Sequence, residues 1–143
     1  MKKILTSIIF TFLLIHCSKK EENLAPVLKF ISISPQNAKE NSDAVQITIE
    51  YRDENGDLGE NNPDINNLFV KNIQTGVVSQ FRIPQLSPDN SQIIISGKFI
   101  IQLGTLAITN GTNEQNFSFE IYAIDRSNQK SNTLITPTIK VVK

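Results

Sequence analysis

Two stretches of the chain alternate strictly between apolar and polar residues, which is the pattern of a β-strand with one buried face. Residues 45–51 and residues 117–123 each place an apolar side chain at every second position. In residues 93–103 the apolar positions share one phase around Gly97, where we expect a bulge or a bend. The run Ile93-Ile94-Ile95 is expected to lie in a buried strand. Stripes with helical spacing are absent after residue 24, so the pattern predicts strands.

Weaker apolar stretches predict four more strands, and turn-forming dipeptides such as Asn55-Gly56 and Asn110-Gly111 separate the segments. These weaker strands cover residues 28–34, 68–73, 78–83 and 133–142. Pro137 cannot donate a ladder hydrogen bond, so we expect an edge position or a bulge there. Seven short strands in residues 25–143 predict an all-β fold, a single antiparallel β-sandwich of about seven strands.

The first 16 residues differ in character from this predicted domain. Lys2 and Lys3 precede an apolar run over residues 4–15, which is the order found in a secretory signal peptide. A membrane-spanning helix needs roughly 20 apolar residues, so a spanning anchor is the weaker alternative. We therefore expect residues 1–16 to be a signal peptide that precedes the folded domain.

The end of the apolar run, Leu14-Ile15-His16-Cys17, resembles the lipobox of bacterial lipoproteins, although His16 stands where Gly, Ala or Ser is usual. The resemblance implies that Cys17 becomes the N-terminus and carries acyl chains such as palmitate, which hold the protein on a membrane. The charged residues 18–23 resemble the export signal of Bacteroidota surface lipoproteins, which implies the outer face of the outer membrane. Residues 17–24 are then a lipidated cysteine and its tether. The alternative is an ordinary secreted protein with a free cysteine.

The last part of the chain carries a second resemblance. Residues 117–125, followed by Arg126-Ser127-Asn128-Gln129-Lys130-Ser131-Asn132, are similar to the last two strands of fibronectin type III and related immunoglobulin-like domains. Asn128 stands where glycine is common, and asparagine enters the left-handed region of backbone conformation more readily than most residues. The resemblance implies an immunoglobulin-like sandwich over residues 25–143, a fold that serves mainly as a spacer or a binding module.

One acidic segment follows the clearest predicted strand. Asp53, Asn55, Asp57 and Asp64 occupy positions 1, 3, 5 and 12 of a loop, which is the spacing of oxygen ligands in a calcium site, and the carbonyl of Gly59 would be a fifth ligand. No helices flank the segment, so it is not an EF-hand. A solvated turn is the simpler interpretation, because Asn-Gly favours a turn and carboxylates keep a loop exposed. Both interpretations stay open.

Charge and composition exclude several classes of function. Residues 17–143 hold 12 basic and 14 acidic side chains, because the first 16 residues contain two lysines and no acid. The resulting net charge of −2 lacks the excess of basic residues that nucleic-acid binding requires, so we exclude nucleic acid as a partner. The single histidine and the single cysteine are His16 and Cys17, so the predicted domain has no residues for a histidine-based triad, thiol catalysis or a Cys/His zinc site.

A carboxylate-dependent hydrolase is the least favoured function. Its two carboxyl groups would have to face each other across a substrate groove, and acids within one polar loop are poorly desolvated. The chain lacks Trp and has only Tyr51 and Tyr122 as tyrosines, which also argues against a stacking platform for sugars. We therefore expect a non-catalytic binding or assembly module on the envelope, with an unidentified protein or glycan partner. The alternative function is a calcium-binding module that uses loop 53–64.

Overall fold

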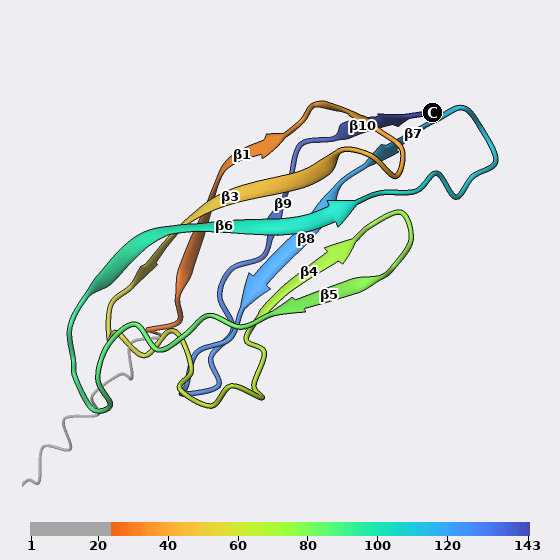
Figure 1. The fold of residues 1–143 in the computed structure, drawn as a ribbon. Coiled ribbons are helices and arrows are strands. Elements are labelled where there is room, and N and C mark those ends of the chain that lie inside the picture. The colour runs from red at the N-terminus through yellow and green to blue at the C-terminus, as the bar shows by residue number, and fades with distance from the viewer. Residues whose placement is uncertain (1–23) are drawn as a thin grey trace, which may run out of the picture.

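The structure, a computed structural model, describes residues 24–143, and in this part of the chain it contains strands and loops without a helix (Figure 1). The predicted all-β class is therefore confirmed. Residues 24–143 accordingly include no helix that is long and apolar enough to cross a membrane. The strands are β1 (Val27–Ser34), β2 (Asn37–Lys39), β3 (Ala44–Asp53), β4 (Leu68–Asn72), β5 (Val78–Phe81), β6 (Ile95–Thr105), β7 (Glu114–Phe117), β8 (Phe119–Ala123), β9 (Leu134–Ile135) and β10 (Ile139–Val142).

The strands form three sheets arranged as a sandwich-like fold (Figure 1). Sheet I has the order β1-β3-β6, sheet II the order β5-β4-β8-β9, and sheet III the order β2-β10-β7. Sheet III lies at the end of the molecule that holds the C-terminus. Neighbouring strands are antiparallel except β2 and β10, which pair in parallel.

Two stretches that the sequence predicts as single strands are interrupted. Ser118 separates β7 from β8, and residues 136–138 separate β9 from β10. Thr136 spans the gap, because its N–H donates to the carbonyl of Phe119 at 2.9 Å and its hydroxyl accepts the N–H of Phe119 at 3.0 Å. Pro137 lies in this interruption between two strands, whereas an edge position or a bulge within one strand was expected. The two chain segments that hold β7–β8 and β9–β10 therefore each contribute one strand to sheet III and one strand to sheet II.

A bulge was one of the two features expected at Gly97, and the structure has none there. Gly97 pairs regularly with Tyr51, and the register shift between β3 and β6 lies at Val45 and Gln46 instead. A Cβ at position 97 would lie 2.7 Å from the hydroxyl oxygen of Tyr51, which is too close for two such atoms. Glycine is therefore needed here to make room for the tyrosine ring, which stacks on Phe99 with centroids 4.3 Å apart.

The prediction of a buried strand over Ile93-Ile94-Ile95 is also wrong. Strand β6 begins only at Ile95, and the side chains of Ile93 and Ile94 are 50% and 56% exposed. These two residues end the long loop between β5 and β6, which packs against the loop after β3. Both the carbonyl oxygen and the side chain of Ile93 lie beside Gly56 of that loop, but half of the Ile93 side chain stays exposed to solvent.

The core draws on all three sheets, and the central strands of sheets I and II contribute alternate residues to it. The inward positions of β3 and β8 are fully or almost fully buried: Val45, Ile47, Ile49, Phe119, Ile121 and Ala123. Continued in the same phase, β3 ends on Asp53, and the chain after β8 reaches Asp125 two residues beyond Ala123. Both carboxylates are buried, at 0% and 6% exposure. The row of buried residues along β3 therefore ends at Asp53, and the row along β8 continues to Asp125. The two acids lie at the same end of the sandwich.

Candidate cation-binding site

Asp53 is the last residue of β3 and points into the protein. Its Oδ2 accepts the N–H of Leu58 at 2.7 Å, which folds the loop back over the carboxylate. Its Oδ1 is buried and has no hydrogen-bond partner. Burial raises the pKa of Asp53, and the negative charge of Asp57 raises it further, although backbone N–H groups oppose the change.

Asp125 begins the tight turn that follows β8. Its Oδ1 accepts the N–H of Gln129 at 2.8 Å, and the turn places Asn128 at φ 60°, the left-handed conformation predicted for this residue. Its Oδ2 is buried and has no partner. Burial raises the pKa of Asp125 to about 6, with further contributions from the negative charges of Asp57 and Asp53. The three carboxylates therefore interact electrostatically although they come from two separate loops.

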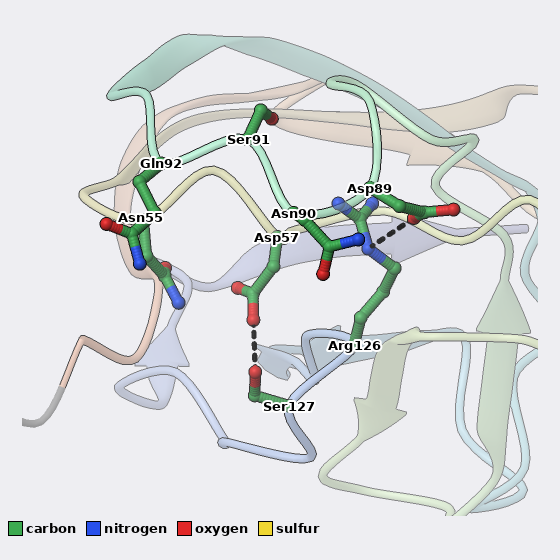
Figure 2. Close-up of a pocket in the computed structure, with 8 residues that line it drawn as sticks. All are labelled: Asn55, Asp57, Asp89, Asn90, Ser91, Gln92, Arg126 and Ser127. Atoms are coloured by element: carbon green, nitrogen blue, oxygen red, sulfur yellow. Dashed lines mark hydrogen bonds and ion pairs between the residues drawn. The ribbon is translucent and has the colours of Figure 1, made fainter.

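Asn55 and Asp57 lie in the loop after β3, on the solvent side of the two buried acids. Each is partly exposed, but the Oδ1 atom of each is buried and has no hydrogen-bond partner. The Oδ2 of Asp57 accepts a hydrogen bond from the hydroxyl of Ser127, which links the loop to the turn after β8 (Figure 2). The backbone carbonyl of Asp57 accepts the N–H of Arg126 at 3.1 Å, so two contacts join these segments.

Four buried side-chain polar atoms in residues 24–143 lack a hydrogen-bond partner, and all four are oxygens of this cluster. They belong to Asp53, Asn55, Asp57 and Asp125. A buried polar atom without a partner costs about 1–3 kcal/mol, and buried carboxylates that repel each other add to this cost. Oxygen atoms of this kind are the ligands that a hard cation binds.

The carboxylates are not already gathered around one point. Among residues 24–143, no group of three or more Asp, Glu, His or Cys side chains lies close enough together to hold a metal ion. The candidate set contains three carboxylates, those of Asp53, Asp57 and Asp125, so in this structure they stand too far apart to hold one ion. Binding would also require the acids to move together, which repulsion opposes until a positive charge is present.

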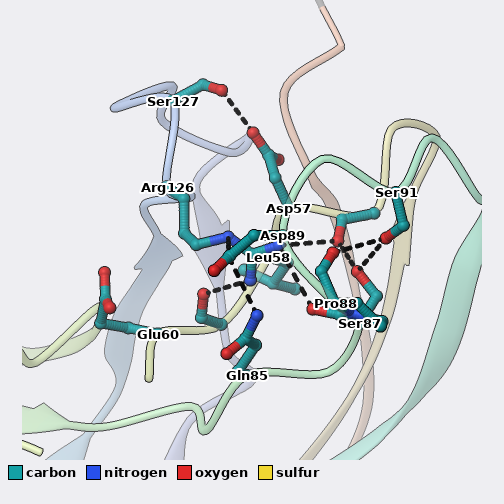
Figure 3. Close-up of polar contacts among 12 residues, drawn as sticks. Asp57, Leu58, Glu60, Gln85, Ser87, Pro88, Asp89, Ser91, Arg126 and Ser127 are labelled. Carbon is teal, nitrogen blue, oxygen red and sulfur yellow. Dashed lines mark hydrogen bonds and ion pairs between the residues drawn. The ribbon is translucent and has the colours of Figure 1, made fainter. Parts of the chain in front are cut away.

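The guanidinium of Arg126 holds the surrounding loops in place. It donates to the carbonyl of Gly59 at 3.0 Å and to the carbonyls of Gly56 and Ser87 at 3.4 Å each. It also forms an ion pair with Asp89 at 3.5 Å (Figure 3). The Arg126 side chain is only 17% exposed, so this one cation joins three loops in a largely buried position.

Two glycines allow the loop after β3 to pack against the loop before β6. Gly56 has a φ of 76° and Gly59 a φ of 97°, both in the region that favours glycine. A Cβ at Gly56 would collide with the carbonyl oxygen of Ile93, and one at Gly59 would collide with that of Pro84. The hydroxyl of Ser87 donates to the carbonyl of Gly56 and completes this contact. These contacts fix the backbone path of the loop that carries Asn55 and Asp57.

A polar pocket of about 440 Å³ opens beside the cluster (Figure 2). The residues of this pocket come from all three loops, and they include Asn55, Asp57, Asp89, Asn90, Gln92 and Arg126. Asn55 and Asp57 thus face the pocket while their Oδ1 atoms belong to the buried cluster. The pocket and the candidate cation site are neighbouring parts of one region.

The structure brings together only part of the predicted ligand set. Asp53, Asn55 and Asp57 lie in one cluster, but Asp64 is exposed, and the carbonyl of Gly59 already accepts a hydrogen bond from Arg126. Reasoning from the loop alone missed Asp125, which supplies the fourth unpartnered oxygen from the turn after β8. The proposed lipidation site, Cys17, lies outside the described residues.

Comparison with models of protein families, with curated proteins and with solved structures gave no significant match for this chain.

Proposed function

We propose that the chain is a non-catalytic, calcium-binding module of the bacterial cell envelope. One observation carries the calcium site: all four buried polar side-chain atoms that lack a partner in residues 24–143 belong to Asp53, Asn55, Asp57 and Asp125. A solvated turn would leave these oxygens in contact with water, where they need no other partner. A bound cation gives all four a partner at once and neutralises the repulsion among the three acids.

The chemistry of the ligands favours calcium over other metals. All four are hard oxygen donors, which disfavours metals that prefer thiolate or imidazole ligands. Mg²⁺ demands near-ideal octahedral geometry and keeps several waters, whereas Ca²⁺ accepts six to eight oxygens in flexible arrangements. Ligands on two separate loops that must move together suit the more tolerant ion. Four side-chain oxygens leave two to four coordination positions for water or another ligand.

Thermal unfolding tests this function. A site filled at 100 times its dissociation constant adds about 2.7 kcal/mol of stability. For a domain of this size that corresponds to a midpoint roughly 10 °C higher in calcium than in EDTA. Magnesium at the same concentration should give a much smaller change. Asp53→Asn should abolish the calcium-dependent change, and Asp64→Asn, at an exposed position of the same loop, should leave it intact. Equal midpoints in calcium and EDTA would contradict the proposal.

The placement at the envelope rests on the sequence. The lipobox resemblance at Cys17 and the charged tether support a lipid-anchored outer-membrane protein exposed on the cell surface. An immunoglobulin-like type of sandwich is supported by the resemblance over residues 117–132 and by the left-handed Asn128 in its turn. Metabolic labelling with an alkynyl fatty acid tests the anchor: wild type should incorporate label and Cys17→Ala should not. Equal labelling of both would exclude lipidation at Cys17.

A further inference from the structure

The polar pocket and the candidate calcium site share two residues, and their arrangement gives the site an inner and an outer side. Asp53 and Asp125 are buried and form the inner side. Asn55 and Asp57 form the outer side, because both also line the pocket. An ion held by these four oxygens is closed off by protein on its inner side. Its remaining coordination positions therefore open into the pocket.

We propose that this pocket binds a neutral glycan, and that two adjacent hydroxyl groups of one sugar complete the coordination of the calcium ion. This inference rests on the proposed calcium function and names the ligand class of the same site. Calcium accepts neutral oxygen ligands as well as carboxylates, so a pair of sugar hydroxyls can replace bound waters without a change in charge. The gain comes from exchanging two mobile waters for two oxygens that the sugar ring already holds in position.

The charges around the pocket favour a neutral ligand over an anionic one. Two carboxylates line it, those of Asp57 and Asp89, together with the basic residue Arg126, and the two buried carboxylates of the candidate calcium site belong to Asp53 and Asp125. With one calcium ion bound, these groups still leave a net charge of −1. The guanidinium of Arg126 is also engaged by three backbone carbonyls and by Asp89, which leaves it poorly placed to pair with a phosphate or a carboxylate. An anionic ligand would meet repulsion that a sugar avoids.

The rest of the pocket offers groups that suit hydroxyls. Asn90 and Gln92, drawn in Figure 2, bring amide groups, each of which both donates and accepts hydrogen bonds. A volume of about 440 Å³ lies within the range of small-molecule sites. The residues that line the pocket include no aromatic ring. Recognition would therefore use calcium coordination and hydrogen bonds instead of ring stacking, which the low aromatic content disfavours.

The test is a binding titration on the purified full chain with neutral methyl glycosides of mannose, galactose and fucose, in calcium and in EDTA. Calcium binding is measured separately by terbium luminescence and its displacement by calcium. At least one glycoside should bind in calcium, and its affinity should fall at least tenfold in EDTA. Asn90→Ala and Gln92→Ala should each weaken glycoside binding at least tenfold while calcium affinity stays within twofold. Gln80→Ala, an exposed glutamine on β5, is the matched control and should change neither.

The two measurements separate failure of the ligand from failure of the metal site. If calcium binds but none of the glycosides does, or if a glycoside binds equally well in EDTA, the glycan proposal is overturned and the calcium function stands. If only sialylated or sulfated glycosides bind, the charge argument is wrong and the ligand class must be revised. If neither terbium nor calcium binds, the proposed function fails and the glycan proposal falls with it.

Discussion

Replacing Asp125 with asparagine should change stability in opposite directions with and without calcium. The carboxylate is buried beside two other acids and has one oxygen without a partner. Asparagine keeps the shape of the side chain, removes its charge and can still accept the N–H of Gln129 through its Oδ1. The Asp125→Asn chain should therefore be more stable than wild type in EDTA, and it should gain less stability when calcium is added.

The size of the effect follows from the pKa. A carboxyl pKa raised from 3.8 to about 6 corresponds to on the order of 3 kcal/mol of destabilisation at neutral pH. The hydrogen bond from the N–H of Gln129 is already included in this shift, and asparagine can keep it. A gain of about 3 kcal/mol is therefore expected in EDTA, or roughly 12 °C in midpoint. In calcium, loss of a charged ligand should lower affinity at least tenfold, which removes about 1.4 kcal/mol of stabilisation.

The assay is urea unfolding of wild type, Asp125→Asn and Asp64→Asn at pH 7.5, each in EDTA and in millimolar calcium. Asp64→Asn is the matched control, because it removes the same charge from an exposed position. The reasoning is refuted if Asp125→Asn destabilises the chain in EDTA, or if it gains as much stability from calcium as wild type does. The first result would mean that the Asp125 carboxylate does not destabilise the metal-free chain, and the second that it does not bind calcium.

Other consequences of the structure can be checked in the same way. Because the folded pKa of Asp125 lies above its unfolded value, the folded chain binds more protons between about pH 4 and pH 6. In EDTA the chain should therefore become more stable, as far as Asp125 contributes, when the pH falls from 7.5 to 5. The stability gained from calcium should shrink over the same range. Thermal melts at several pH values check both results. Arg126→Met should cost about 2–4 kcal/mol in urea unfolding, with or without calcium, because three backbone carbonyls lose a donor. Gly56→Ala should cost at least about 2 kcal/mol, since its Cβ meets the carbonyl of Ile93, whereas Gly111→Ala, with a similar φ of 77° and open space, should cost about 1 kcal/mol.

The alternation of apolar residues predicted the central strands well, because their burial depends on local phase. Residues 45–51 and 117–123 supply the inward side chains of β3, β7 and β8 as expected. The break at Ser118 could not be predicted, because Phe117 and Phe119 keep the same phase across it. At Ser118 the backbone bonds to a segment distant in sequence, because its N–H donates to the Oε1 of Gln74 at 2.8 Å and its carbonyl accepts the N–H of Ile73 at 3.0 Å.

The sequence predicted part of the candidate site. The spacing of Asp53, Asn55 and Asp57 indicated oxygen ligands, and in the structure each of the three has a buried oxygen without a hydrogen-bond partner. Continuing the inward phase of β8 by two residues would have identified Asp125 as a buried carboxylate. The hydrogen bond that Arg126 donates to the Gly59 carbonyl could not be predicted, because Arg126 comes from another loop and reaches Gly59 only in the folded chain.

The most direct test of this account is a calorimetric titration of calcium into the metal-free protein at pH 7.5. The account predicts one calcium ion per chain in wild type and in Asp64→Asn, with binding lost in Asp53→Asn and at least tenfold weaker in Asp125→Asn. Absence of binding at millimolar calcium would contradict the account, and so would binding that Asp64→Asn abolishes and Asp125→Asn leaves unchanged.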